Sequence, residues 1–254
     1  MADDLAFALA LADLADEVTL RAYRSADLVV ETKPDLTPVS AADREVERVL
    51  RERIARDRPG DAVVGEEYGA TGGAARRWVI DPIDSTKNYV RGVPIWATLI
   101  ALQEDEAGVV GVVSAPALST RWWAERGQGA YAGGRRLAVS NVTDLADAQF
   151  SYSSLHGWET RGRMRAFLDL CGKCWRTRGF GDFYSYMLVA EGAVDVAAEP
   201  EVSLWDLAAL QVIVEEAGGT FTDLDGNHTP AGGSAVATNG RLHETVLKAL
   251  APDQ

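Results

Sequence analysis

Acidic side chains recur at short spacing in residues 78–89, which read W-V-I-D-P-I-D-S-T-K-N-Y. Asp81 follows an apolar, strand-like run, a proline stiffens the turn, and Asp84 comes three residues later, so both carboxylates can converge at a strand's exposed end. Two neighbouring acids repel each other unless a cation lies between them. Magnesium prefers such hard oxygen ligands and keeps waters or phosphate oxygens beside a few carboxylates. The segment therefore predicts a metal site.

Ser85 and Thr86 follow Asp84 directly, and we expect them to begin a helix or a helical turn. The free backbone N–H groups of such a start, with the two hydroxyls beside them, would suit a phosphate bound to the metal. The alternative for this stretch is simply a capped turn, because aspartate, serine and threonine are common turn and cap residues.

Two further acidic segments strengthen the metal prediction. G-E-E-Y-G places Glu66 and Glu67 after the strand-like A-V-V, and W-D-L-A-A-L places Asp206 at the start of a helix. A carboxylate at a helix start is also an ordinary N-terminal charge, so each segment alone is ambiguous. Together with Asp81 and Asp84, Glu66 and Asp206 make four carboxylates from three segments, the quantity that a two-metal site requires.

The chain resembles the inositol monophosphatase family, essentially from end to end. The motifs that carry the resemblance are D-P-I-D-S-T, the preceding G-E-E, and the later W-D-x-A-A with A-G-G closing its helix. The resemblance implies an α/β fold, the layered αβαβα sandwich of the inositol monophosphatase and fructose-1,6-bisphosphatase type. It also implies dependence on magnesium, with two or three ions in each active site, and a homodimer.

By motif position, the resemblance assigns the metal ligands to Glu66, Asp81, Asp84, Asp206 and the backbone carbonyl of Ile83. Glu67 is then expected to be a neighbouring surface acid. Where this chain departs from the common pattern of the family, no departure removes one of these metal ligands.

The resemblance also implies the catalytic residues of a phosphomonoester hydrolase. Thr86, helped by Asp43 in S-A-A-D-R, matches the pair that orients and deprotonates the attacking water. We expect magnesium to hold the phosphate while a water, activated with help from Thr86 and Glu66, attacks phosphorus in line with the ester oxygen. No covalent enzyme intermediate is needed.

Substrate contacts are expected from Ser85, Thr86 and Asp206 around the phosphate. Many family members carry glycine at the position of Ser85. Serine also occurs there, so we expect a small change in backbone freedom and not a loss of activity. Lys87 and Arg91 could touch the phosphate or pair with nearby acids, and surface pairing is the commoner outcome.

Specificity is expected to depend on two acids in the C-terminal half. Glu199 matches the position where inositol-type members contact a substrate hydroxyl, and Asp182, in G-F-G-D-F-Y-S-Y, falls where those members carry a small residue. A second acid beside Glu199 would suit a cationic leaving group, such as the amine of histidinol phosphate. The alternative for Asp182 is a helix N-cap.

The substrate expected from these residues is histidinol phosphate, a small metabolite of histidine biosynthesis. The stretches D-S-T-K-N-Y-V-R-G-V-P-I-W and G-D-F-Y-S-Y-M-L-V-A-E-G-A-V-D are similar to those of actinobacterial family members that hydrolyse it. Inositol monophosphate, a sugar bisphosphate or a 3′-phosphoadenosine nucleotide are alternatives, and a non-catalytic ligand-binding homologue is a further one. Four aromatic residues could wall an imidazole pocket or belong to the core: Trp158, Phe180, Tyr184 and Tyr186.

The elements that must position these residues follow from periodicity. Helical spacing covers residues 4–24 and 41–57, and the intervening K-P-D-L-T-P predicts an extended loop that could move. Strand-like runs then cover residues 62–64, 78–80, 95–102, 108–115 and 121–124. Beyond them we expect strands at 149–153 and 194–198, helices at 161–170, 182–191 and 204–217, a strand near Ala235 and a terminal helix. Such blocks of helices and strands predict stacked layers.

No repeat or long linker divides the chain, so we expect one domain over residues 1–254, with an N-terminal lobe of about 1–140 and a C-terminal lobe of about 141–254. The formal net charge of −13 disfavours nucleic acid and anionic membranes as partners. An acidic N-terminus and the lack of a long apolar run favour a cytoplasmic location.

The two cysteines form a lone C-G-K-C, and we expect structurally incidental thiols, with a redox pair or half a zinc site as the alternative.

Overall fold

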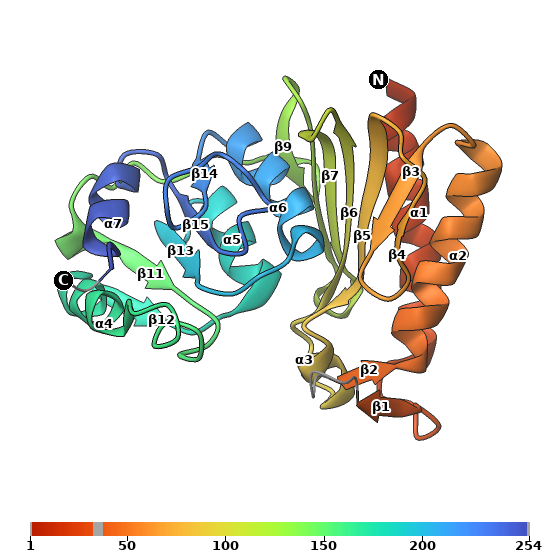
Figure 1. The fold of residues 1–254 in the computed structure, drawn as a ribbon, viewed down its shortest axis with the longest axis horizontal. Coiled ribbons are helices and arrows are strands. Elements are labelled where there is room, and N and C mark those ends of the chain that lie inside the picture. The colour runs from red at the N-terminus through yellow and green to blue at the C-terminus, as the bar shows by residue number, and fades with distance from the viewer. Residues whose placement is uncertain (1, 33–37, 253–254) are drawn as a thin grey trace.

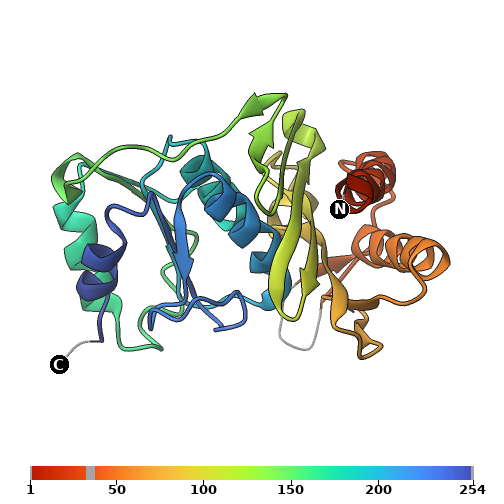
Figure 2. The same cartoon turned by 90° about the horizontal axis from the view of Figure 1, so that it is seen from above.

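The computed structural model describes residues 2–32 and 38–252, which form five stacked layers of helices and sheets (Figure 1). Two helices cover one face of a large sheet, two more lie between this sheet and a smaller one, and a third pair covers the far face of the smaller sheet (Figure 2). The predicted αβαβα sandwich is therefore confirmed. The loop predicted at K-P-D-L-T-P lies, except for its last proline, outside the described residues.

The first layer consists of α1 (Ala2–Ala22) and α2 (Ala41–Asp57). Both helices turn an apolar stripe toward the large sheet, where Leu11 of α1 and Leu50 of α2 are fully buried in one cluster with Trp78. Ser40 begins α2 as its N-cap: its hydroxyl accepts from the Asp43 N–H, and the Asp43 carboxylate accepts from the Ser40 N–H.

The large sheet has the strand order β10-β9-β8-β7-β6-β5-β3-β4. Its strands are β3 (Ala62–Gly65), β4 (Gly69–Thr71), β5 (Arg76–Asp84), β6 (Ala97–Glu104), β7 (Ala107–Ala115), β8 (Thr120–Glu125), β9 (Gly129–Ala132) and β10 (Arg135–Arg136). All neighbouring pairs are antiparallel except β3 and β5, which are parallel. The carboxyl ends of β3 and β5 therefore meet at the same edge of the sheet.

The middle layer holds α5 (Asp182–Ala190) and α6 (Leu204–Glu216), packed between the two sheets. Every residue of α6 from Leu207 to Val214 is buried, as expected for a helix that is apolar on nearly all sides. Gly111 on β7 permits the close contact, because a Cβ atom there would lie 2.5 Å from the carbonyl oxygen of Ala209. This packing fixes the direction in which the N-terminus of α6 points.

The second sheet has the order β12-β11-β13-β15-β14. Its strands are β11 (Gln149–Ser151), β12 (Arg176–Arg178), β13 (Val196–Glu199), β14 (Thr220–Thr222) and β15 (Ala235–Thr238). The outer helices α4 (Met164–Lys173) and α7 (His243–Ala249) cover it through a separate core that includes Phe150 and Trp158. The 3-10 turns η1 (Pro116–Leu118) and η2 (Leu145–Asp147) complete the connections.

The short helix α3 (Thr86–Val90) and the hairpin of β1 (Val30–Thr32) and β2 (Pro38–Ser40) lie together at one end of the large sheet (Figure 1). A small apolar cluster of Ala42, Ile83, Tyr89 and Trp96 joins α2, β5 and α3. This end of the sheet is where β5 delivers its last residues.

The predicted helices all occur, but periodicity missed the shorter strands β1, β2, β4, β9, β10, β12 and β14, each of two to four residues. Helix α4 begins at Met164, later than the predicted 161, because Gly162 has a positive φ of 63° that a helix does not continue through. None of the helices in residues 2–32 and 38–252 combines the length and the hydropathy that a membrane-spanning helix needs.

Cys171 and Cys174 lie at the end of α4 as free, half-buried thiols against the second core. Burial raises the pKa of each thiol to about 11, so little thiolate is present at neutral pH. The one candidate metal-binding group found in the described residues does not include them. These observations favour the expectation of structurally incidental cysteines.

Candidate active site

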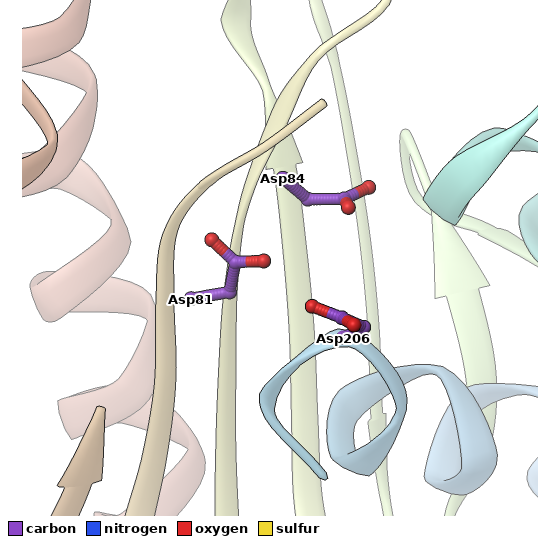
Figure 3. Close-up of side chains that lie close together, drawn as sticks. All are labelled: Asp81, Asp84 and Asp206. Carbon is purple, nitrogen blue, oxygen red and sulfur yellow. The ribbon is translucent and has the colours of Figure 1, made fainter. Parts of the chain in front are cut away.

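Strand β5 delivers both aspartates of the D-P-I-D segment to the end of the large sheet. The strand runs on to Asp84 instead of ending near Ile80, with an irregularity in its pairing to β6 between Asp81 and Asp84. The Asp81 carboxylate accepts a hydrogen bond from the Ile83 N–H at 3.0 Å, which fixes this kink. The kink allows both carboxylates to face the same side, as Figure 3 shows.

Helix α6 supplies the third carboxylate. Asp206 lies in its first turn and accepts a hydrogen bond from the Ser203 N–H at 2.7 Å, so it also serves the helix start. One oxygen each from Asp81, Asp84 and Asp206 lies within 4.8 Å of the others, although the residues come from two segments more than 100 positions apart (Figure 3). The structure thus brings together three of the predicted metal ligands.

Electrostatics make this cluster unfavourable without a cation. Burial, followed by repulsion from Glu66 and Asp84, raises the pKa of Asp81 well above its ordinary value. Burial also raises the pKa of Asp206 to about 7, although the hydrogen bond from the Ser203 N–H acts to lower it. The pKa of Asp84 rises well above its ordinary value through burial and the nearby Asp182. These oxygens are the donors that a hard divalent cation takes, so the residues fit a metal ion.

Glu66 lies next to this cluster but not inside it. It follows β3, and its N–H donates to the Ile80 carbonyl of the parallel strand β5 at 3.3 Å. Its carboxylate is not part of the group within 4.8 Å, yet it is near enough to raise the pKa of Asp81 and of Asp206. Glu67 is half-buried and does not line the cavity described below.

Glu47 on α2 holds the turn that carries Glu66. Its side chain is fully buried and accepts hydrogen bonds from the N–H of Glu67 at 2.7 Å and of Tyr68 at 3.2 Å, while Arg51 pairs with it at 2.7 Å. A side chain at Gly65 would overlap this carboxylate. Glu47 was missed in the sequence, although an acid next to Val46 on the buried face of an amphipathic helix is a usable signal.

The predicted pair Thr86 and Asp43 is also brought together. The Thr86 hydroxyl lies 3.3 Å from an Asp43 oxygen and 3.0 Å from the Ile83 carbonyl oxygen. The other Asp43 oxygen accepts from the N–H and the hydroxyl of Ser40, and burial raises the pKa of Asp43. Asp43 is therefore fixed in place, with one oxygen left to face Thr86.

A cavity of about 700 Å³ opens beside the cluster. Its walls include most of the predicted site residues: Glu66, Asp84, Ser85, Thr86, Asp182, Glu199 and Asp206. Asp43, Asp81 and Ile83 are buried behind the cavity wall. The start of α5, the segment that precedes α6 and the first turn of α6 also line the cavity, the last two through Glu201 and Trp205.

The second acidic pair, Asp182 and Glu199, lines the same cavity. Burial raises the pKa of Glu199 to about 7, with Asp182 adding to the rise, and the Tyr186 hydroxyl donates to Glu199 at 2.8 Å. Asp182 is the first residue of α5, and Gly181 occupies the N-cap position. The N-cap alternative for Asp182 was therefore wrong; its carboxylate accepts a hydrogen bond from the Ser85 hydroxyl instead.

The remaining candidates divide between cavity and core. Phe180 and Lys87 line the cavity, whereas Arg91 does not. Trp158 is fully buried in the second core, stacked on Phe167, so it cannot wall the pocket. The simple capped turn proposed for the D-S-T segment is not what forms, because the Ser85 side chain makes no cap hydrogen bond to α3.

Comparison with known proteins shows the family that the chain resembles. The family model described as the inositol monophosphatase family matches residues 1–253. The histidinol-phosphatase of Streptomyces coelicolor is 58% identical over 254 residues, 96% of each chain, and that of Mycobacterium tuberculosis is 59% identical over 98% of each chain. An inositol monophosphatase structure from Zymomonas mobilis superposes with a TM-score of 0.88 at 32% identity, covering 98% of each chain.

The raised carboxylate pKa values predict an unusual pH dependence for the metal-free protein. The pKa of Asp206 is about 4 in the unfolded chain and about 7 in the folded protein, so the folded state binds its proton more tightly. This proton binding stabilises the folded state at low pH, and the stabilisation is lost as the pH rises from about 4 through about 7. In EDTA, we expect the melting temperature to fall between pH 5.5 and 8. Asp206→Asn, which can still accept from Ser203, should raise it at pH 8 by about 2–8 °C.

Asp144→Asn is the matched control, because Asp144 also accepts a backbone hydrogen bond at a helix start but lies outside the cluster. It should melt like the wild type at both pH values. A metal-free melting temperature for Asp206→Asn that equals or falls below the wild-type value at pH 8 would contradict the account of the cluster.

The contacts of Glu47 predict an effect on metal affinity. Glu47→Ala removes the carboxylate that accepts from the N–H groups of Glu67 and Tyr68 and loosens the turn that carries Glu66, so the magnesium concentration for half-activation should rise about 10- to 100-fold. Glu47→Gln keeps an acceptor oxygen and should have a smaller effect. Glu45→Ala, which removes only an exposed pair with Arg48 on the same helix, should have none. Unchanged magnesium activation in Glu47→Ala would show that Glu47 does not position the site.

Proposed function

Because this chain belongs to the inositol monophosphatase family, we propose that it binds magnesium ions at Asp81, Asp84 and Asp206 and hydrolyses histidinol phosphate to histidinol and phosphate. The substrate assignment rests on the second pair of acids, Asp182 and Glu199, which line the same cavity as Asp84 and Asp206 of the aspartate cluster. The reaction is a phosphomonoester hydrolysis, and it would place the protein in histidine biosynthesis.

The proposed metal ligands are the three aspartates of the cluster, with Glu66 and the Ile83 carbonyl joining them. Glu66 is close enough to act on the charges of Asp81 and Asp206. The Phe183 N–H donates to one oxygen of Asp84 at 2.8 Å, which orients that carboxylate and leaves its other oxygen available. When bound, two or three magnesium ions would neutralise the phosphate, acidify a water and stabilise the departing alkoxide.

Thr86 and Asp43 are the proposed residues that orient the attacking water and receive its proton. With Ser40 occupying one oxygen of Asp43, the other can accept the Thr86 proton, and the Thr86 oxygen then accepts from a water in the cavity. Thr86 lines the cavity and Asp43 does not, so Asp43 acts through Thr86. Glu66, which also faces the cavity, is the second proposed proton acceptor.

The cavity lining outside the aspartate cluster suits a cationic leaving group. Asp182, Glu199 and the exposed Glu201 supply negative charge, and Phe180 and Trp205 supply aromatic surface on which a flat ring can lie. Histidinol phosphate offers a protonated amine and an imidazole ring to these two kinds of surface. The names of the two relatives at 58% and 59% identity support the same substrate.

Inositol monophosphate is the second candidate substrate, favoured by the Zymomonas mobilis neighbour, itself an inositol monophosphatase. A neutral polyol would leave the half-buried Asp182 with only Lys87 to offset its charge, so we rank it second. A non-catalytic ligand-binding role is less favoured, since the aspartate cluster and the Thr86–Asp43 pair are all in place.

We further propose that the protein works in the cytoplasm as a homodimer on a small phosphorylated metabolite. The family resemblance supports the dimer. The net charge of −13 disfavours nucleic acid and anionic membrane as partners.

An assay of phosphate release with magnesium tests the proposal. We expect kcat/KM for histidinol phosphate to exceed that for inositol 1-phosphate by at least about tenfold, since one charged contact is worth about 1.5–3 kcal/mol. EDTA should abolish turnover, and Asp84→Asn should lower kcat/KM at least about 100-fold. Asp105→Asn, in the remote β6–β7 turn, is the control that should remain active. Preference for inositol 1-phosphate would overturn the substrate, and full activity of Asp84→Asn would overturn the metal site.

A further inference from the structure

Ser85 and Asp182 make an unusual contact across the active-site cavity. Their side chains are hydrogen-bonded although they lie 97 positions apart, one before α3 and the other at the start of α5. Both have a left-handed backbone, with φ of 69° at Ser85 and 49° at Asp182. Such backbone is unfavourable for residues other than glycine, and it persists only where surrounding contacts require it.

The hydrogen bonds around Ser85 determine where its hydroxyl proton points. The Asn88 side-chain amide donates to the Ser85 oxygen at 2.9 Å and to the Ile95 carbonyl at 2.8 Å. Because the Ser85 oxygen already accepts from Asn88, its single proton is directed to the Asp182 carboxylate. Asn88, itself anchored to Ile95, therefore holds the serine in this orientation.

The position of Asp182 is electrostatically unfavourable for the protein alone. Its carboxylate is half-buried and lies near enough to Asp84 and Glu199 to raise the pKa of both. Lys87, on the exposed side of α3, provides only partial compensation. A glycine at position 85 would relieve the left-handed strain but would leave this carboxylate without its hydroxyl donor.

The backbone of α5 is held as firmly as the side chain of Asp182. The Phe183 N–H donates to the Asp84 carboxylate at 2.8 Å, so the first turn of α5 is tied to Asp84 while Asp182 is tied to Ser85. Two neighbouring residues of the β5–α3 turn thus fix the start of α5. This arrangement sets the distance between the phosphate end of the cavity and the acid that meets the leaving group.

We infer that Ser85 is a positioning residue that holds the Asp182 carboxylate toward the substrate and thereby sets the preference for phosphate esters whose leaving group is positively charged. The inference rests on the proposed function and extends it. A family member with glycine at this position lacks the hydroxyl that holds the acid. Ser85 acts through Asp182, so its effect should disappear when the charge of Asp182 is removed.

A double-mutant cycle on substrate selectivity tests the inference. The quantity measured is the ratio of kcat/KM for histidinol phosphate to that for inositol 1-phosphate in the magnesium-loaded enzyme. Ser85→Gly should lower this ratio at least about fivefold, because its loss of kcat/KM on histidinol phosphate should exceed any loss on inositol 1-phosphate. Asp182→Asn, which tolerates the same backbone, should lower it similarly, and the double variant should show no further loss.

Ser119→Gly is the matched control, because Ser119 has the same left-handed backbone, with φ of 54°, but lies in the exposed turn after η1 away from this cavity. It should leave the ratio unchanged. Thermal melting of Ser85→Gly within a few degrees of Ser119→Gly would show that both fold. An unchanged ratio in Ser85→Gly, equal losses on both substrates, or losses that multiply in the double variant would overturn the inference.

Binding of histidinol by calorimetry separates failure of the inference from failure of the proposed function. If the wild type shows no preference for histidinol phosphate but binds histidinol at least about fivefold more tightly than Ser85→Gly, the substrate is wrong and the positioning role stands. A preference that survives in Ser85→Gly overturns the positioning role alone. A wild-type protein with neither the preference nor histidinol binding overturns both.

Discussion

Mutual repulsion between three clustered carboxylates, one buried and two half-buried, is the constraint on which the rest of this structure depends. Asp81, Asp84 and Asp206 place one oxygen each within 4.8 Å of the others, and burial raises the pKa of all three. In water such side chains would separate, so the fold must hold them together until a cation neutralises them. A rigid frame that tolerates this local instability is what a metal-dependent enzyme needs.

Three features of the fold supply that frame. The parallel pairing of β3 with β5 brings Glu66 to the same sheet edge as Asp81, and α6, packed between two sheets, directs Asp206 at them. Buried acids outside the cluster then hold the connecting turns: Glu47 binds the amides after Glu66, and Asp43 joins the start of α2 to Thr86. The same turn after β5 reaches across the cavity through Ser85 to α5. In the proposed function, metal binding and substrate selection would thus share one short segment.

The sequence predicted the chemistry of the site better than it predicted the contacts that support the site. The helices and long strands followed from their periodicity, and the acids at strand and helix ends pointed to one site. The short edge strands carried too few residues for a pattern, and the kink that lets Asp81 and Asp84 face one side depends on pairing with β6. The sequence could mark Glu47 only as a buried acid. The contacts of Glu47 and Ser85 could not be predicted, because each is made with backbone or side chains distant in the sequence. The residues next to Asp182 in the sequence are compatible with a helix N-cap, and only the tertiary structure shows its contact with Ser85.

The most direct test of the central claim is calorimetric titration of the metal-free protein with magnesium chloride at pH 7, in two buffers of different ionisation enthalpy. Since the pKa of Asp206 is about 7 and those of Asp81 and Asp84 are raised well above their ordinary value, binding should release at least about half a proton per site, and less at pH 8.5. Proton release that falls with rising pH and shrinks in Asp206→Asn would support the account. Magnesium binding without proton release, or no binding at millimolar concentrations, would contradict it.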